Sequence, residues 1–171
     1  MLSKFLPNEY VKSIHDINIH TLKEHGIKGI LIDLDNTLVP WDQPHATSEV
    51  IDFFYKLRKH EIQATIISNN NELRVRSFAE PIEIPFLFNA RKPLRRTFVK
   101  GANQMGLNRD EVAVVGDQLL TDVFGGNRAG FYTILVVPIV QTDAPITKFN
   151  RAIERRILNY FKKKGLISWE D

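Results

Sequence analysis

Short apolar runs alternate with longer segments of helical spacing along most of this sequence. Five of the runs have the length of a strand and are rich in branched and aromatic side chains. They occupy residues 29–32, 63–67, 86–89, 112–115 and 132–137. Because segments that suit helices separate most of them, right-handed crossovers should place the five strands in one parallel sheet. The pattern therefore predicts an α/β fold with a Rossmann-like, doubly wound sheet.

The segments between these runs carry apolar residues at the spacing of amphipathic helices. An N-terminal helix is expected over about residues 10–24, before the first strand. A second is expected from Thr47 or Ser48, which are good N-cap residues, to about His60. A third follows Pro93 and covers about residues 94–105.

The last helix, expected over about residues 146–164, is basic as well as amphipathic. Its apolar stripe includes Phe149, Ile153, Ile157 and Phe161. Its basic residues are Lys148, Arg151, Arg155 and Lys162 to Lys164. Such a helix could lie on an anionic membrane surface. Packing of the stripe on the domain, with a solvated basic face, is the favoured interpretation.

Composition limits the class of protein. The 171 residues, 43% of them hydrophobic, suffice for a single domain over residues 1–171 with a sizeable core. No apolar run is long enough to cross a bilayer, and no signal-peptide pattern is present, so we expect a cytoplasmic protein, or one peripheral to the membrane. The absence of cysteine excludes phosphatases with a cysteine nucleophile. A net charge of +3 gives little reason to expect a nucleic-acid partner.

Two carboxylates follow the first strand, at Asp33 and Asp35. Side chains two positions apart leave a strand on the same face, so both acids should reach the carboxyl edge of the sheet, where ligands bind in such folds. Two carboxylates about 4 Å apart repel by roughly 4 kcal/mol at an effective dielectric of 20. Bound Mg²⁺ would offset this repulsion, since it prefers oxygen ligands. The alternative is that both are turn and capping residues.

Polar residues follow the other strands as well. Ser68 and Asn69 come after the second strand and lead into a helix, an arrangement suited to holding phosphate. Lys92 follows the third strand, and Asp117 the fourth. Asp122 lies five positions later, where it could complete the outer shell of a metal ion or hold Lys92 in place.

Taken in order, these residues resemble the four motifs of the haloacid dehalogenase (HAD) superfamily. The motifs are Asp33-Leu34-Asp35-Asn36-Thr37, Ser68, Lys92 before Pro93, and Gly116-Asp117 with Asp122. The resemblance implies a five-stranded sheet of order 5-4-1-2-3 and hydrolysis of a phosphate monoester with Mg²⁺. It implies catalysis by Asp33, as nucleophile, and by Asp35, as acid and base. The substrate-binding set is Asn36, Thr37, Ser68, Asn69 and Lys92, and the metal set is Asp33, Asp35, Asp117 and Asp122.

Motif spacing bears on the substrate. Asp33 and Ser68 are 35 positions apart and Ser68 and Lys92 are 24 apart, which leaves no room for the cap domain of many HAD enzymes. An open site suits a large phosphorylated substrate or a lipid headgroup, unless an oligomeric neighbour covers it. Further details resemble the YqeG branch of HAD subfamily IIIA, which is related to phosphatidylglycerophosphate phosphatases. They are Leu6-Pro7, Tyr10, Ile27-Lys28-Gly29 and Gly116-Asp117-Gln118 with Thr121-Asp122.

Other functions fit the sequence less well. A receiver domain would place its phosphate acceptor after the third strand, where this chain has only Asn89. The absence of Gly-x-x-x-x-Gly-Lys excludes a P-loop nucleotidase. A non-catalytic phosphate-binding or scaffold protein, and a nucleic-acid-associated regulator, stay open as alternatives.

Overall fold

The computed structural model describes residues 1–140 and 145–168, and its centre is one parallel sheet. Six strands lie in the order β1-β6-β5-β2-β3-β4. They are β1 (Glu9–Val11), β2 (Gly29–Ile32), β3 (Gln63–Ile67), β4 (Phe86–Leu87), β5 (Val112–Gly116) and β6 (Tyr132–Val136). The five predicted strands therefore have the predicted order, and the doubly wound α/β fold is confirmed. The third strand is shorter than expected, and a sixth was not predicted.

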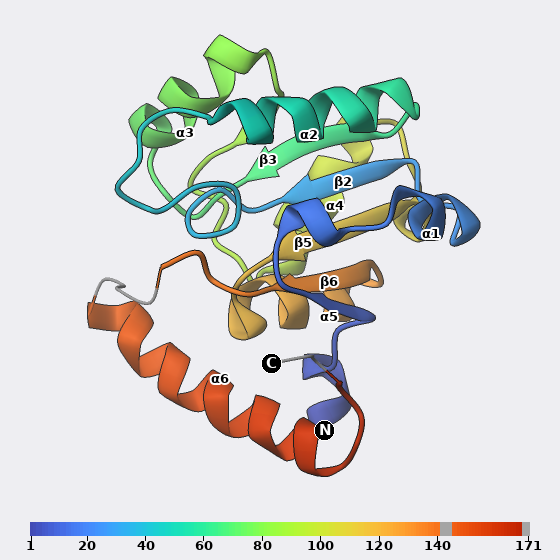
Figure 1. Ribbon diagram of the computed structural model, residues 1–171, viewed down its shortest axis with the longest axis vertical. Helices are drawn as coiled ribbons and strands as arrows, with labels where there is room; N and C mark the ends of the chain where they lie inside the picture. Colours follow the sequence, from blue (N-terminus) through green and yellow to red (C-terminus); the bar gives the residue numbers. More distant parts are fainter. Residues whose placement is uncertain (141–144, 169–171) are drawn as a thin grey trace.

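Helices cover both faces of the sheet (Figure 1). They are α1 (Ile19–Glu24), α2 (Ser48–Lys59), α3 (Glu72–Ala79), α4 (Arg95–Gln104), α5 (Phe124–Ala129) and α6 (Pro145–Lys163). Shorter helical turns are η1 (Leu2–Phe5), η2 (Ile14–Asp16), η3 (Glu80–Ile82), η4 (Arg109–Glu111) and the π-helix η5 (Leu119–Val123). None of the described helices is both long and apolar enough to span a bilayer.

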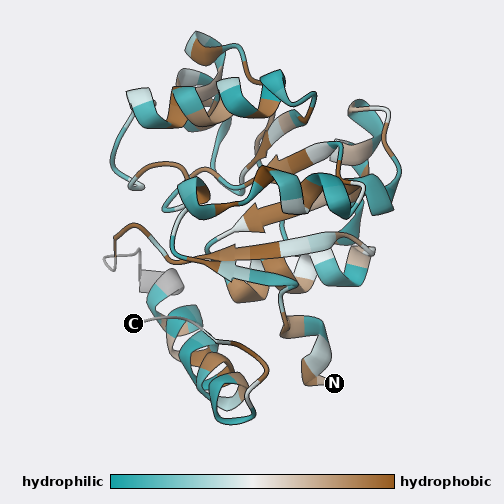
Figure 2. Cartoon of the chain, turned by 45° about the vertical axis from the view of Figure 1, so that its right-hand side comes forward, coloured by the Kyte–Doolittle hydropathy of each residue, from teal (hydrophilic) through white to brown (hydrophobic). Residues whose placement is uncertain are grey.

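The alternation of side chains along β2 divides the core into two layers. Ile30 and Ile32 pack with residues of α1, α2 and α3, whereas Leu31 packs with Phe98 of α4 and Ala129 of α5. All four residues of β2 are buried, as expected for a central parallel strand. In Figure 2 the strands are largely apolar and the outer turns of the helices are hydrophilic.

The prediction of a helix over about residues 10–24 was wrong for its first half. Tyr10 pairs with Leu135 in the β1–β6 register, and the Asn8 carboxamide accepts a hydrogen bond from the Thr133 N–H. This pairing covers the edge of β6 that would otherwise present unpaired backbone groups. The helical spacing of Tyr10, Ile14 and later residues arises instead from a strand, a short turn and the brief helix α1.

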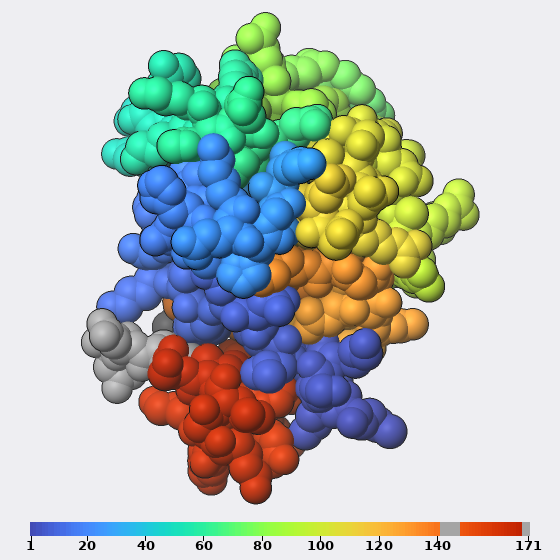
Figure 3. Space-filling view, turned by 90° about the vertical axis from the view of Figure 1, so that its right-hand side faces the viewer, coloured from blue at the N-terminus to red at the C-terminus, as the bar shows by residue number. Residues whose placement is uncertain are grey.

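The C-terminal helix α6 packs beside the β1–β6 edge, close to the N-terminus (Figures 1 and 3). Ile157 and Leu158 contact a small cluster formed by Leu119, Val123 and Leu135. Most of its basic residues are exposed, including Arg155, Arg156 and Lys162 to Lys164. Part of the apolar stripe is thus a packing surface, since Phe161 is buried and Phe149 is exposed, and α6 matches the helix expected over about 146–164.

Replacing Phe161 tests how firmly α6 is attached. Phe161 is 1% exposed, so Phe161→Ala should lower the free energy of unfolding by about 3–5 kcal/mol through the cavity that it leaves. Urea denaturation measures this change. Phe149 lies on the same helix but is 69% exposed, and Phe149→Ala should change stability by no more than about 0.5 kcal/mol. Equal effects of the two changes would contradict the packing of α6 described above.

Candidate active site

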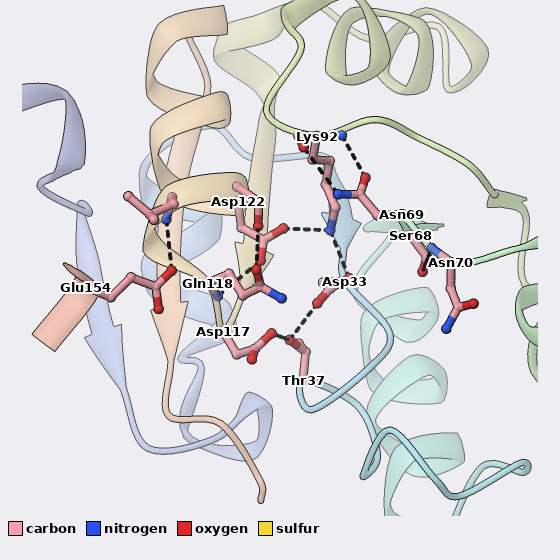
Figure 4. A network of polar contacts seen from close by, with 12 residues as sticks. Asp33, Thr37, Ser68, Asn69, Asn70, Lys92, Asp117, Gln118, Asp122 and Glu154 are labelled. Carbon is pink, nitrogen blue, oxygen red and sulfur yellow. Dashed lines mark hydrogen bonds and ion pairs between the residues drawn. The ribbon is translucent and has the colours of Figure 1, made fainter. Parts of the chain in front are cut away.

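The carboxyl ends of β2, β3 and β5 surround a hollow of about 340 Å³. It is lined by Asp33, Asp35, Asn36, Trp41, Ser68, Asn69, Asn70, Lys92, Gln118 and Thr121. Six of the nine predicted site residues belong to this lining. The other three, Thr37, Asp117 and Asp122, lie next to Asp33 (Figure 4). All nine therefore meet at one edge of the sheet.

Three of the predicted acids form a buried cluster. Asp33, Asp117 and Asp122 each offer an oxygen atom within 4.8 Å of the other two. Their convergence depends on two different strands, because Asp33 follows β2 and Asp117 follows β5, the neighbour of β2 in the sheet. The site requires a residue without a Cβ at Gly116, since a methyl group there would overlap the Asp122 carboxylate.

Lys92 provides a buried positive charge beside this cluster. Its Nζ atom donates to Asp33 Oδ1 at 2.8 Å and to Asp122 Oδ1 at 2.6 Å. The Asn69 side chain fixes the Lys92 backbone, accepting from its N–H at 2.6 Å and donating to its carbonyl at 3.2 Å. Asp122 thus holds Lys92, as one of its two predicted roles requires, and it also lies within the acid cluster.

Burial controls the protonation of these groups. It raises the pKa of Asp117 well above the ordinary value, with a further rise from Asp33 and an opposing effect of Arg151. Burial also raises the pKa of Asp122 to about 7, although Lys92 opposes it. Burial alone would lower the pKa of Lys92, but Asp122 and Asp33 raise it above the ordinary value. A cation bound among these acids would oppose the rise in their pKa.

Thr37 and Ser68 connect the cluster to the surrounding loops. The Thr37 hydroxyl lies 3.0 Å from Asp117 Oδ1 and 3.4 Å from Asp33 Oδ2, and thereby bridges the two acids. Ser68 is buried, and its hydroxyl accepts the Asn70 N–H at 3.1 Å. Thr37 lies behind the lining of the hollow, where it contacts the acids, whereas Ser68 is part of the lining.

Asp35 lies apart from the other acids, held by residues of the β3–α3 segment. Arg74 donates to Asp35 Oδ1 through Nε at 3.1 Å and a terminal nitrogen at 3.0 Å. The Asn70 side chain donates to Asp35 Oδ2 at 3.0 Å. The Asp35 side chain therefore lines the hollow without joining the cluster of three acids.

Asn36 adopts a left-handed backbone conformation, with φ of 60°, that asparagine tolerates better than most residues. Its side-chain oxygen accepts the Trp41 N–H at 3.2 Å, and its carbonyl accepts the Ile139 N–H at 3.0 Å. Trp41 is 49% exposed at the rim of the hollow. Asn36 thus positions the loop that carries Trp41.

Arg151 reaches the acid cluster from α6. It forms an ion pair with the Asp117 carboxylate, and it donates to the Asp117 carbonyl at 2.8 Å and to Glu154 at 3.0 Å. Glu154 in turn accepts the Leu120 N–H at 3.1 Å (Figure 4). The expectation that Arg151 belongs to the solvated basic face is therefore wrong, because this side chain turns inward.

Arg74 and Arg151 are parts of the site that were not predicted from the sequence. Arg151 is 34 positions from Asp117, and nothing in local spacing indicates that α6 folds back onto β5. Arg74 was open to recognition, since it lies in the first turn of the helix that begins at the phosphate-holding corner. That turn faces the same edge of the sheet as Asp35.

The cluster has the chemistry of a site for a hard divalent cation. Its donors are carboxylate oxygens, which Mg²⁺ and similar ions prefer, and they converge from separate segments. Neighbouring Lys92 and Ser68 can bind phosphoryl oxygens in the same hollow. The arrangement can therefore hold a metal ion and a phosphate group side by side.

Comparisons with known proteins point to the same chemistry. The family described as mitochondrial PGP phosphatase matches residues 2–141. The chain is 54% identical to a protein of Bacillus subtilis named probable phosphatase YqeG, with 100% of each chain covered. It is 28% identical to phosphatidylglycerophosphate phosphatase 1, chloroplastic/mitochondrial, of Arabidopsis thaliana. That match covers 94% of this chain and 49% of the plant protein.

Solved structures share the fold. One is the cobalt-bound form of the deoxy-D-mannose-octulosonate 8-phosphate phosphatase from Haemophilus influenzae. It has a TM-score of 0.53 and 20% identity, with 86% of this chain and 96% of that chain covered. An uncharacterized protein from Listeria monocytogenes has a TM-score of 0.54 and 16% identity, covering 75% and 97%. At these identities the likeness establishes the arrangement of elements and nothing finer.

Removal of Arg151 tests its ion pair with Asp117. Arg151→Met keeps much of the side-chain volume but leaves a buried carboxylate without its cationic partner, which should cost the metal-free protein about 3 kcal/mol of stability. Urea denaturation in the presence of a chelator measures this cost. The exposed neighbour Arg156 offers a matched control, because Arg156→Met should change stability by no more than about 0.5 kcal/mol. Equal losses of stability in the two variants would show that Arg151 does not support the site.

Proposed function

Because the chain belongs to the mitochondrial PGP phosphatase family, in the YqeG branch of the HAD phosphatases, we propose that it hydrolyses a phosphate monoester through a phosphorylated Asp33 with Mg²⁺ bound nearby. The observation that carries this proposal is the meeting of Asp33, Asp117, Asp122 and Lys92 at one buried point. A structural core would gain nothing from three clustered acids, whereas phosphoryl transfer needs a carboxylate nucleophile and concentrated positive charge.

Asp33 is the proposed nucleophile. One of its carboxylate oxygens attacks the phosphorus atom, the bond to the leaving oxygen breaks, and a phospho-Asp33 intermediate forms. Lys92 and Thr37 hold the carboxylate in place through its two oxygens, at 2.8 and 3.4 Å. Division of the transfer into two steps lowers each barrier.

Asp35 is the proposed acid and base. Protonated Asp35 gives its proton to the leaving oxygen, and the resulting carboxylate then takes a proton from the water that hydrolyses phospho-Asp33. In the structure Arg74 and Asn70 donate to both of its oxygens. Proton delivery therefore requires one of these contacts to give way when substrate enters.

The phosphoryl oxygens would lie among polar groups that line the hollow. Lys92 supplies a positive charge, and Ser68 supplies a hydroxyl. Asn69 acts on the same oxygens indirectly, because it fixes the Lys92 backbone. Asn36 also lines the hollow, and Thr37 lies behind it, with its hydroxyl hydrogen-bonded to Asp117. Fixed donors of this kind stabilise charge that develops during phosphoryl transfer.

Asp33 and Asp117, with the carbonyl of Asp35, would hold Mg²⁺, and Asp122 would act from the outer shell. When bound, the ion neutralises negative charge on the phosphate and on the acid cluster. Arg151 keeps Asp117 in place from the opposite side, through its carboxylate and its carbonyl.

The proposed substrate is a lipid headgroup phosphate such as that of phosphatidylglycerophosphate. The relative in Arabidopsis carries that activity in its name, and Asp33 lies in a hollow that no inserted domain covers. Within residues 33–92, all of which the structure describes, the chain forms only a loop, α2, β3, α3, η3 and β4 before Lys92. The exposed basic residues of α6 would favour an anionic membrane surface. A non-catalytic phosphate-binding protein would keep these features without turnover.

Substitution of the nucleophile provides the direct test. Asp33→Asn should lower kcat for an aryl phosphate by about a thousandfold or more, because an amide cannot form the acyl phosphate. Steady-state kinetics with Mg²⁺ measures the loss, and circular dichroism checks the fold. Asp52 is exposed on α2, so Asp52→Asn should retain wild-type kcat. Substantial turnover by Asp33→Asn would assign the chemistry to another group.

The acid cluster also predicts how Mg²⁺ and pH act together on stability. Asp117 and Asp122 have pKa values raised from 3.8, to about 7 for Asp122, so the folded metal-free protein retains protons that the unfolded chain loses. The contribution of Asp122 to stability is present below pH 3.8 and is lost as the pH rises through about 7, and that of Asp117 is lost as the pH rises through its own raised pKa. Bound Mg²⁺ would replace these protons.

Thermal denaturation should therefore show a larger rise in Tm on addition of Mg²⁺ at about pH 8 than at about pH 5, where protons compete with the ion. Asp117→Asn should remove most of the rise at the higher pH. An equal rise in Tm at both pH values would show that Mg²⁺ does not bind these two acids. Activity that persists in the presence of a chelator would show that the reaction does not need the ion.

A further inference from the structure

A second cavity lies between the end of β6 and the helix α6. Its volume is about 520 Å³, within the range of small-molecule sites, which is roughly 300–1,000 Å³. In Figure 1, α6 follows β6 in the chain and forms a separate layer beside the sheet. The α6 wall lies beyond residues 2–141, the part of the chain that matches the phosphatase family. We call this cavity the α6 groove.

The α6 groove shares a wall with the candidate active site. Asp117 lines the groove, and its carboxylate also belongs to the acid cluster. Gln118 and Thr121, which follow it in the chain, line the hollow around Asp33. Residues 117–121 thus separate two neighbouring cavities, and a molecule that places one phosphate next to Asp33 could extend its other end toward α6.

The α6 groove combines apolar and charged residues. Its apolar residues are Leu119, Leu135 and Val137, together with Leu158 of α6. Its α6 side carries Lys148, Arg151 and Arg155 against two acids, Asp117 and Glu154. Both acids already form ion pairs with Arg151. The exposed Lys148 and Arg155 therefore add positive charge beside an apolar surface.

We infer that the α6 groove binds the glycerol phosphodiester and the first part of the acyl chains of a phospholipid whose terminal phosphate monoester lies beside Asp33. Lys148 and Arg155 contact the phosphodiester, and Leu119, Leu135, Val137 and Leu158 contact the acyl chains. An amphipathic ligand with an internal anionic group satisfies both surfaces. This inference rests on the proposed phosphatase function, and it identifies α6 as the element that selects lipid substrates over small phosphate esters.

Kinetics on matched substrates test the inference. The lipid probe is a water-soluble dihexanoyl phosphatidylglycerophosphate, and the small probe is p-nitrophenyl phosphate. Arg155→Glu reverses a charge at the groove, and Val137→Trp narrows it. Each should lower kcat/KM for the lipid relative to the aryl phosphate by about tenfold, mainly through KM, which corresponds to about 1.4 kcal/mol of binding.

Two features keep the variants interpretable. Arg155 is exposed and Val137 is 39% exposed, so neither change disturbs the buried core. Arg156 lies next to Arg155 but outside the groove, and Arg156→Glu should leave the lipid-to-aryl ratio at its wild-type value. Circular dichroism and Tm confirm that all three variants fold.

Binding without turnover separates the groove from the catalytic proposal. Dihexanoyl phosphatidylglycerol lacks the phosphate monoester, and its Kd, measured by calorimetry, should rise about tenfold in Arg155→Glu and stay unchanged in Arg156→Glu. Groove variants that lower activity on both substrates equally, or that bind this lipid as wild type does, would overturn the inference. A wild-type protein that binds the lipid but hydrolyses neither phosphate would overturn the proposed function and not the groove.

Discussion

Three carboxyl groups buried within 4.8 Å of one another need positive charge or bound protons to offset their repulsion, and this requirement shapes much of the structure. Lys92 brings one cation from the β4–α4 connection, and Arg151 brings another from α6. Each cation is held by a further contact, since Asn69 fixes the Lys92 backbone and Glu154, one turn along α6, binds Arg151. Electrostatic compensation thus joins β2, β3, β5 and α6 at one point.

The parallel sheet brings these residues together without any long-range sequence signal. Its strands all end at the same edge, so Asp33, Ser68 and Asp117 each need only to follow an apolar run of strand length. For this reason the sequence was sufficient to predict those positions, whereas the order of the five strands was implied by the resemblance to the HAD superfamily. Strand runs and strand ends are local patterns, and the crossover rule then determines which edge they share.

Features that depend on tertiary pairing were not predictable in the same way. The sequence around β1 favours a helix, because Tyr10 and Ile14 have helical spacing. A strand is favourable there only because it can pair with the open edge of β6. The side chain of Asp35 lies with Arg74 and Asn70, and neither of these partners was predicted. In the sequence, Arg151 cannot be distinguished from the other residues of a basic helical face, and its side chain turns inward only because Asp117 lies beside α6. In each case the deciding partner is far along the chain.

The functional unit includes α6, because Arg151 of this helix forms an ion pair with Asp117. The match to the family model ends at residue 141, before α6, whereas the match to the Bacillus subtilis relative covers the whole chain. A fragment cut at that boundary would keep every acid of the cluster and Lys92, but it would lose the second cation and one wall of the adjoining groove. A domain boundary placed at the end of the family-model match would therefore divide a charge-balanced centre, because Arg151 lies beyond it.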